Sequence, residues 1–241
     1  MEHGCYLMTV IVVIPTYNEV GNLLDLCSDL FSLPLDLEIL VIDDSSPDGT
    51  GEVAQKLKFQ EDKFNVIHRK GKQGLGTAYI EGLTWALKNS KADIIAQMDA
   101  DFSHNPSALL SLVEVATKGV VAVGSRYSVG GATDGLGRAR RYFSLLANSY
   151  IRFVLGLSIK DVTGAFRCWP RTALMRIELA SMKASGFAIL PEMLFLASCQ
   201  GLEINEVPIR FNARRSGQSK LTIKIIIESL VNVWAIRWRK G

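Results

Sequence analysis

Asp99 and Asp101 lie at the end of an apolar run that begins at residue 92. Two carboxylates this close repel each other, and a divalent cation removes the penalty for ionising both. Mg²⁺ and Mn²⁺ accept carboxylate, phosphate and water oxygens. The D-x-D segment therefore predicts a site for a divalent cation and a phosphate group, with Ser103 and His104 near enough to assist by hydroxyl or through water.

The same segment has a simpler interpretation. A helix is expected from residue 106, and Ser103 or Asn105 could cap its first turn. On this interpretation the acids belong to a solvent-exposed turn. The D-x-D segment alone leaves both interpretations open.

Polar residues also follow other apolar runs of the first half. Tyr17 and Glu19 follow the first run, Asp43 and Asp44 end or follow the second, and Arg126 follows the fifth. Ligands of doubly wound sheets bind at the carboxyl ends of the strands, where an acid after the second strand commonly meets a ribose hydroxyl or a base edge. An aromatic and an acid beside it could hold a nucleoside.

The elements that must position these residues alternate between strand and helix. The nearly continuous apolar runs are typical of a parallel sheet that is buried on both faces, and amphipathic segments separate them. This alternation predicts a doubly wound α/β fold. The expected strands are 9–15, 37–43, 64–68, 92–99 and 119–125, and the expected helices are 20–31, 50–58, 75–89 and 106–117.

Beyond residue 126 the pattern changes. Residues 128–140 are glycine-rich and are expected to form a mobile loop. A strand is expected at 203–211, followed by the polar loop 212–220. The remaining segments predict helices at 141–156, near 171–178, at 185–201 around Glu192, and at 221–238. No repeat, low-complexity tract or linker divides the chain.

Charge is segregated along the 241 residues, of which 48% are hydrophobic. Residues 1–125 carry a net charge of −8, whereas residues 126–176 and 207–241 each carry +7. We therefore predict one domain, 1–241, with a nucleotide- and metal-binding half (1–125) and an acceptor- and phosphate-binding half (126–241). Ordinary variation of surface charge is the alternative.

Several classes of protein are excluded by missing motifs. The glycine-rich segment 71–82 matches neither the P-loop pattern G-x-x-x-x-G-K-[ST] nor the dinucleotide pattern G-x-G-x-x-G. Gly74 and Gly76 are instead expected to allow close packing of a helix on the sheet. The three histidines fit no serine or cysteine hydrolase motif, so the chemistry is not expected to need a histidine base.

No apolar stretch reaches the ~18–20 residues that a membrane-spanning helix needs. The N-terminal segment does not have the pattern of a signal peptide. Four cysteines, Cys5, Cys27, Cys168 and Cys199, lie far apart, as expected of reduced thiols in a cytosolic protein.

Seven segments occur together in a characteristic order: VIPTYNE, IDDSSPDGT, GLGTAYIEG, MDADFSHNP, GSRY, DVTGAFR and RRSGQSKL. Together they resemble the dolichol- or polyprenol-phosphate mannosyltransferases of glycosyltransferase family 2, over residues 10–222. The resemblance implies the glycosyltransferase A fold, in which helices flank a Rossmann-like, mostly parallel sheet. One departure is Leu190, where relatives often have glutamine.

The resemblance implies inverting transfer of mannose from GDP-mannose to a polyprenyl or dolichyl monophosphate, with Mg²⁺ or Mn²⁺ as cofactor. Asp99, Asp101 and Arg126 are the implied catalytic residues, and Asp99, Asp101 and Ser103 the implied metal ligands. The implied nucleotide-sugar site contains Pro15, Tyr17, Glu19, Ile42, Asp44, Asp99, Ala100, Asp101, Arg126, Arg214 and Lys220, and the acceptor phosphate would meet Arg126, Arg140 and Ser144.

The acceptor lipid lies in a bilayer, so we expect a peripheral protein on the cytoplasmic side of a membrane. We expect no transmembrane helix in this chain, which would bind the membrane surface itself or use an anchoring partner subunit. Segments 141–156 and 221–240 mix bulky apolar residues with basic residues and tryptophan, as interfacial helices do. Packing of 221–238 on the core is an equal alternative.

Rival functions are a polyprenyl-phosphate glycosyltransferase that uses UDP-glucose or a similar donor, and a non-catalytic binding subunit. Nucleic acid is not an expected partner.

Overall fold

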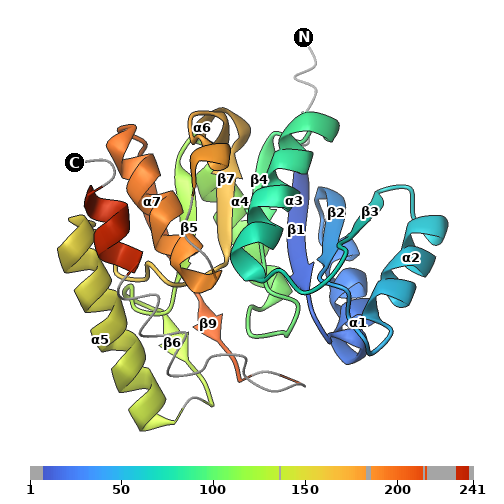
Figure 1. The fold of residues 1–241 in the computed structure, drawn as a ribbon, viewed down its shortest axis with the longest axis horizontal. Helices are drawn as coiled ribbons and strands as arrows, with labels where there is room; N and C mark the ends of the chain where they lie inside the picture. Colours follow the sequence, from blue (N-terminus) through green and yellow to red (C-terminus); the bar gives the residue numbers. More distant parts are fainter. Residues whose placement is uncertain (1–7, 136, 183–185, 214, 216–231, 239–241) are drawn as a thin grey trace.

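Seven strands form one sheet in the order β3-β2-β1-β4-β7-β5-β8, shown in Figure 1. The structure is a computed structural model that describes residues 8–135, 137–182, 186–213, 215 and 232–238. All neighbouring strands are parallel except β7, which runs antiparallel to β4 and β5. The strands are β1 (Thr9–Thr16), β2 (Asp36–Asp43), β3 (Phe64–His68), β4 (Ile94–Gln97), β5 (Val121–Ser125), β7 (Arg167–Pro170) and β8 (Ile204–Pro208).

Register places the predicted site residues at one edge of this sheet. β1 and β2 pair from Thr9↔Asp36 to Thr16↔Asp43, so both strands end together. On the other side of β1, Gln97 at the end of β4 pairs with Val13. The segments that leave these three strands therefore begin at the same edge, as the doubly wound prediction requires.

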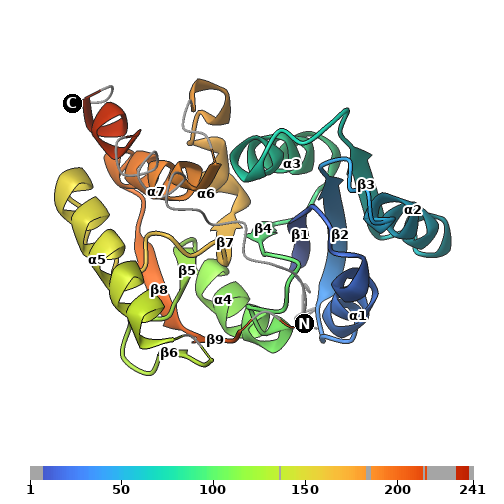
Figure 2. The ribbon, with the colours of Figure 1, turned by 60° about the horizontal axis from the view of Figure 1, so that its bottom comes forward.

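Helices cover both faces of the sheet (Figure 2). Apolar residues of α1 (Val20–Phe31), α2 (Thr50–Gln60) and α4 (Leu109–Ala116) pack on one face. Those of α3 (Leu75–Asn89), α5 (Arg138–Leu155), α6 (Arg171–Met175) and α7 (Ile189–Cys199) pack with the other. Three short 3₁₀ helices lie at Pro106–Ala108, Leu179–Ser181 and Gly186–Ala188. No helix within the described ranges is long and apolar enough to cross a membrane.

The second half departs most from the prediction. Residues 167–170 form β7, a central strand that was not predicted, because four residues with a leading arginine lack a strand-length apolar run. The expected strand at 203–211 is divided into β8 and β9 (Arg210–Phe211). β9 pairs with β6 (Ala132–Thr133), which lies inside the glycine-rich segment, and α5 begins at Arg138 rather than at 141.

Close packing of α3 on the sheet depends on Gly82. A Cβ atom on Gly82 would lie 2.5 Å from Val13 Cγ1 and 2.6 Å from Ile42 Cδ1. The prediction for Gly74 and Gly76 was wrong: nothing lies within 4 Å of a Cβ on Gly74, and one on Gly76 would meet the backbone of the 3₁₀ helix at 186–188 rather than the sheet. The glycine that the sheet requires is one turn or more further along α3.

We expect Gly82→Ala to lower the free energy of unfolding by about 1–3 kcal/mol, because the added methyl overpacks the space between α3 and the sheet. Alanine would otherwise stabilise a helix by about 1 kcal/mol over glycine. Urea unfolding measures the difference. Gly71→Ala is the control, since nothing lies within 4 Å of that site. A more stable Gly82→Ala protein would contradict the close contact.

Candidate active site

The D-x-D turn begins two residues after β4, and hydrogen bonds hold its two carboxylates in place. Asp99 Oδ1 accepts a hydrogen bond from the Tyr79 hydroxyl at 3.1 Å, and Asp101 Oδ1 accepts one from the Ser103 backbone N–H at 3.0 Å. Tyr79 is fully buried on α3, and burial together with the nearby Asp99 charge raises the pKa of its phenol well above the usual value. The phenol therefore remains a hydrogen-bond donor to Asp99 across the physiological range.

The donor set of this turn fits a hard divalent cation. The Ser103 hydroxyl is buried, yet its Oγ has no hydrogen-bond partner among the described residues. A buried polar atom without a partner is costly unless a ligand satisfies it. Asp99, Asp101 and Ser103 would offer only oxygen atoms, which Mg²⁺ and Mn²⁺ prefer. No three His, Cys, Asp or Glu side chains gather at a metal-sized site in the described ranges, so phosphate oxygens would have to complete the coordination.

His104 packs against the D-x-D turn. Its ring is buried, stacks on Phe166 with ring centroids 5.1 Å apart, and meets the Phe211 ring edge-on at 5.6 Å. Its Nδ1 accepts from the Asp99 backbone N–H over 3.5 Å. Burial lowers the pKa of His104, which favours the neutral ring that this acceptor role needs. The histidine thus has a packing role in this structure.

The segment after β9 is fixed against the same turn. The Asn212 N–H donates to the Ser103 carbonyl at 3.0 Å, and the Arg215 N–H donates to the Asp101 carbonyl at 3.3 Å. The Arg215 guanidinium lies 5.3 Å from the Phe102 ring. Two segments about 110 residues apart in sequence therefore meet at the backbone of the D-x-D turn. Arg214 and Lys220, the predicted phosphate-binding residues of this loop, lie outside the described residues.

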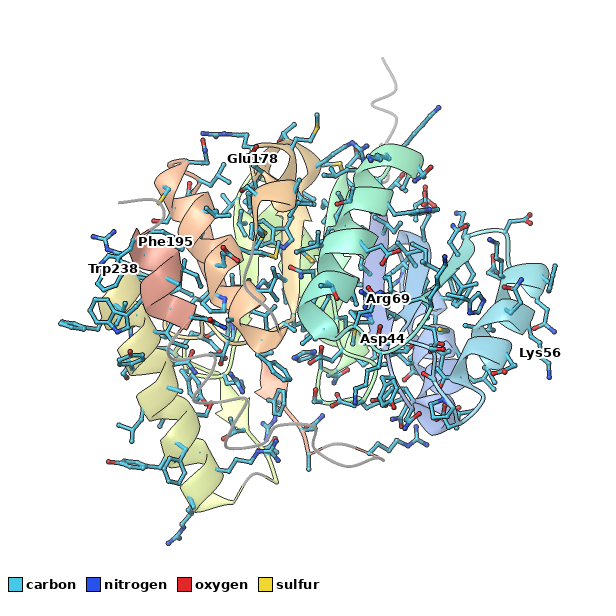
Figure 3. All side chains as sticks on the ribbon, in the orientation of Figure 1. Asp44, Lys56, Arg69, Glu178, Phe195 and Trp238 are labelled. Atoms are coloured by element: carbon cyan, nitrogen blue, oxygen red, sulfur yellow. The ribbon has the colours of Figure 1, made fainter. Side chains whose placement is uncertain are left out.

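Asp44, after β2, organises the loop that precedes α3. Its carboxylate accepts from Arg69 Nη1 at 2.7 Å, from the Gly74 N–H at 2.7 Å and from the Gln73 N–H at 3.1 Å. Figure 3 shows Asp44 and Arg69 beside each other below α3. Because Asp44 is only 4% exposed and meets three donors, its first role is to fix this loop. Lys72 of the loop lies 4.1 Å above the ring of Tyr17.

The end of β1 contributes the remaining predicted nucleotide-binding residues. The Glu19 N–H donates to Thr50 Oγ1 at 2.9 Å, and Glu19 Oε2 accepts from Asn22 at 2.9 Å. Pro15 pairs with Ile42 in the sheet, but the Ile42 side chain is fully buried beneath α3. The structure thus brings Pro15, Tyr17, Glu19 and Asp44 to one edge of the sheet, while the Ile42 side chain lies in the core, and Ala100 is buried within the D-x-D turn.

Arg126, after β5, forms a buried ion pair with Asp161. Its Nε and Nη2 donate to the two carboxylate oxygens of Asp161 at 2.7 Å each. The charged partners favour their ionised forms, so the pKa of Arg126 is raised and that of Asp161 is lowered, despite burial acting in the opposite direction on each. Arg126 also lies 5.2 Å from the Phe211 ring, which contacts His104. Arg126 is therefore connected through the Phe211 ring to His104, which packs against the D-x-D turn.

The predicted acceptor residues lie on α5. Arg140 is exposed in its first turn, and Ser144 Oγ accepts from the Tyr127 hydroxyl at 2.7 Å. Tyr127 directly follows Arg126, whose guanidinium lies 5.1 Å from the tyrosine ring. The structure thereby connects Ser144 to the region of Arg126.

Sequence reasoning missed four supporting residues: Tyr79, Arg69, Asp161 and Arg167. Three of them lie in segments that the analysis singled out, GLGTAYIEG and DVTGAFR, but nothing in those segments showed what the side chains touch. Arg167 is fully buried and donates to the carbonyls of Val162, Gly164 and Leu190. Burial lowers its pKa to about 9.

Comparison with known proteins shows the family of this chain. The model of the family described as glycosyl transferase family 2 matches residues 11–178. The chain belongs to glycosyltransferase family 2. This family 2 enzyme is 38% identical over 233 residues to the polyprenol monophosphomannose synthase of Mycolicibacterium smegmatis, covering 95% of this chain and 88% of the relative. It is 37% identical over 235 residues to the undecaprenyl-phosphate mannosyltransferase of Micrococcus luteus, covering 96% of both chains.

Solved structures confirm the glycosyltransferase A fold of this family 2 enzyme. Mannosyl-3-phosphoglycerate synthase of Rubrobacter xylanophilus superposes with a TM-score of 0.71 at 19% identity, covering 97% of this chain and 74% of that one. Glucosyl-3-phosphoglycerate synthase of Mycobacterium tuberculosis, solved with Mn²⁺ and UDP, gives 0.67 at 18% identity, covering 97% and 80%. The prediction of a single-domain, mostly parallel sheet flanked by helices is confirmed.

The Arg126–Asp161 pair makes stability depend on pH at the acid end. The pKa of Asp161 in the folded protein lies below the unfolded value of about 3.9, so the pair stabilises the fold above that pH and the contribution is lost as pH falls through the lower folded pKa. We expect Asp161→Asn to lower the free energy of unfolding by about 3–5 kcal/mol at pH 7, because it leaves a buried charge unpaired.

Chemical unfolding between pH 2 and pH 7 measures this difference, which should shrink as the pH falls below about 4. Asp134→Asn is the control, since Asp134 pairs with Arg210 at the surface and such pairs contribute about 1 kcal/mol or less. Parallel pH profiles for wild type and Asp161→Asn would contradict the assigned ion pair.

Proposed function

We propose that this enzyme transfers mannose from GDP-mannose to a polyprenyl or dolichyl monophosphate, with inversion at the sugar carbon, and releases GDP. The observation that carries the proposal is the buried D-x-D turn at the edge of a glycosyltransferase A sheet. Two relatives of 37–38% identity, matched over nearly the whole chain, are named as mannosyl-transferring enzymes that act on polyprenyl phosphates. The position of the turn agrees with binding of a nucleotide diphosphate.

The donor nucleoside would bind at the ends of β1 and β2. Tyr17, partly exposed beneath Lys72, offers an aromatic face to a base, and Glu19 lies beside it. Asp44 would act through the loop that it holds, because its carboxylate already accepts from Arg69 and two backbone N–H groups. Pro15 and the backbone at Ile42 complete this end of the proposed guanosine pocket.

Asp99, Asp101 and Ser103 would hold Mg²⁺ or Mn²⁺ against the donor diphosphate. Such a cation, when bound, stabilises the negative charge that grows on the leaving diphosphate. Residues of the chain already orient the two carboxylates: the Tyr79 hydroxyl donates to Asp99, and the Ser103 N–H donates to Asp101. Ala100 is buried between them, so the turn is anchored in the core rather than free to adapt.

The acceptor phosphate would attack the sugar without help from a base. A phosphate monoester has a second pKa near ~6, so it is mostly a dianion at neutral pH. Its approach to the donor brings two anions together, and basic residues must offset their repulsion. Arg126, Arg140, Arg214 and Lys220 are proposed for this task, with Ser144 as a hydroxyl donor. Arginine suits it because its planar fork matches phosphate oxygens.

The outer face of α5 and the helix at 232–238 form the proposed membrane-facing surface. Figure 1 shows the two helices side by side. The Trp234 indole donates to the Tyr150 hydroxyl at 2.8 Å and joins them. Val233 and Ile236 are buried, so this helix both packs on the core and presents aromatics outward. The exposed apolar side chains are Tyr142, Phe143, Leu145, Leu146, Tyr150, Phe153, Trp234 and Trp238.

Basic residues flank these aromatics, since Arg138, Arg140 and Arg141 begin α5. Aromatic and aliphatic side chains next to arginine are typical of a helix that lies in the interface of an anionic bilayer. We therefore propose that the enzyme binds peripherally to the cytoplasmic side of a membrane, by itself or with an anchoring partner subunit. Residues 221–231, the first part of the predicted C-terminal amphipathic helix, lie outside the described residues.

Nucleotide binding tests the donor and the metal site together. We expect the enzyme to bind GDP more tightly with Mn²⁺ than without it, and more tightly than UDP. Asp101→Asn should weaken the Mn²⁺-dependent part at least about tenfold, because it removes a carboxylate ligand. Calorimetric titration measures each affinity.

Asp62→Asn is the control for this titration. Asp62 is exposed just before the amino end of β3, whereas the proposed site lies at the carboxyl ends of the strands. Preference for UDP would replace the donor by UDP-glucose or a similar sugar nucleotide. If folded protein binds neither nucleotide, a non-catalytic subunit becomes the better account.

Membrane binding tests the surface on α5. We expect the double variant Phe143→Ser, Phe153→Ser to bind anionic vesicles roughly tenfold more weakly or worse, since burying one such side chain contributes about 1.5–3 kcal/mol. Vesicle co-sedimentation measures this. Phe59→Ser is the matched control, because Phe59 is 81% exposed on α2, away from α5. Equal losses for both variants would exclude α5 as the docking surface.

A further inference from the structure

The guanidinium of Arg126 is held along one edge only. Nε donates to Asp161, and Nη2 donates both to Asp161 and to Thr163 Oγ1 at 2.9 Å. No hydrogen bond of Nη1 lies within the described part of the chain. The two N–H groups of Nη1 therefore remain as the donors that Arg126 can offer to a ligand, in an orientation that the other edge fixes.

Asp161 is itself immobilised. It is fully buried, its carboxylate also accepts from the Arg126 backbone N–H at 3.0 Å, and its own N–H donates to Glu206 Oε1 at 3.0 Å. A buried ion pair contributes little to stability relative to apolar residues of the same volume, because both charges lose their hydration. Stability alone therefore gives no reason for placing this pair here.

Thr163 connects the pair to helix α5. Its hydroxyl oxygen accepts from Arg126 Nη2 and from Asn148 Nδ2 at 3.1 Å, and its hydroxyl hydrogen is directed to Asp161 over 3.5 Å. One donor and two acceptor positions are all that a threonine hydroxyl has. Each is used, so the hydroxyl has one orientation that satisfies all three neighbours.

Asn148 completes the connection from the buried side of α5. Its Oδ1 accepts from the Val162 N–H at 2.8 Å and the Thr163 N–H at 3.3 Å, and its Nδ2 also donates to the Ser144 carbonyl at 2.9 Å. Ser144, one turn earlier, meets the Tyr127 hydroxyl. Helix α5 is thus attached at two successive turns, through Thr163 to Arg126 and directly to Tyr127, the residue that follows it.

We propose that Thr163 and Asn148, together with Asp161, are positioning residues that fix the Arg126 guanidinium to helix α5. The proposal rests on the proposed function, in which Arg126 contacts a transferring phosphate and α5 holds the acceptor. Reacting atoms must come within about 3–3.5 Å in the correct orientation, and an error of about 1 Å can cost a hundredfold in rate. A shared anchor keeps the arginine and the acceptor helix in one relative position.

A double-mutant cycle separates positioning from a merely structural role. Thr163→Val removes the hydroxyl, and Arg126→Lys removes the fork that the hydroxyl holds. We expect Thr163→Val to lower kcat/KM for transfer of mannose from GDP-mannose to undecaprenyl phosphate by about tenfold, and to have little further effect when Arg126 is lysine. Thr163→Ser keeps the hydroxyl and should restore most of the activity.

The guanidinium itself gives a readout that does not need turnover. With ¹⁵N-labelled arginine, the wild type should show a motionally restricted guanidinium signal that Arg126→Lys removes and that Thr163→Val converts to a freely rotating one. Thr9→Val is the control: its hydroxyl donates to Asp36 at the opposite end of β1, so neither kinetics nor this signal should change.

The outcomes distinguish the two proposals. If Arg126→Lys leaves transfer unchanged, the oriented guanidinium is not needed and the positioning role is overturned, whereas a wild-type protein that does not transfer mannose overturns the proposed function itself. If Arg126→Lys lowers transfer but the effects of the two substitutions multiply independently, only the positioning role is overturned. A freely rotating Arg126 guanidinium in the wild type overturns it as well, whether or not Thr163→Val folds.

Discussion

Buried carboxylates at the carboxyl edge of the sheet are the constraint on which the site depends. Asp44, Asp101 and Asp161 are each at most 4% exposed, and an ionised carboxylate at such depth must be matched by donors. Each is matched differently: Asp44 by Arg69 and backbone N–H groups, Asp101 by the following turn, and Asp161 by Arg126. The hydrogen bonds that these carboxylates accept hold the loops in place around the proposed donor site.

Packing in the apolar core also determines the position of Asp99 in the D-x-D turn. Gly82 lets α3 approach the sheet closely, and Tyr79, one turn earlier on α3, reaches Asp99 with its hydroxyl. Because Tyr79 is wholly buried, its position is set by packing on the strands rather than by solvent. The orientation of a proposed metal ligand therefore depends on how tightly a helix packs, which connects core packing to catalysis without any contact between Gly82 and the site.

The sequence was most informative where pattern and period are local. Strands β1 and β2 span eight residues each, and the acids at their carboxyl ends lie next in sequence to the strands that place them. The outcome was poorest where partners lie far apart in the chain. β7 is only four residues long and lies between strands that are distant in sequence, and one of the carbonyls that accept from its buried Arg167, that of Leu190, is 23 positions away. A charged residue in a central strand looks like a loop residue until its partners are known.

Arg126 shows the same limit for function. The resemblance of the sequence predicts a phosphate-binding role for Arg126, but its partner Asp161 is 35 positions away, and the pair is nearly neutral as a unit. A neutral pair attracts distant phosphates weakly, so Arg126 would contribute directed donors at short range instead of a long-range field. The arginines at the start of α5, including Arg140, are exposed at the surface, whereas the Arg126 side chain is only 11% exposed. Attraction of the anionic acceptor and orientation of its phosphate would thus fall to different arginines, one group at the surface and one fixed in the core.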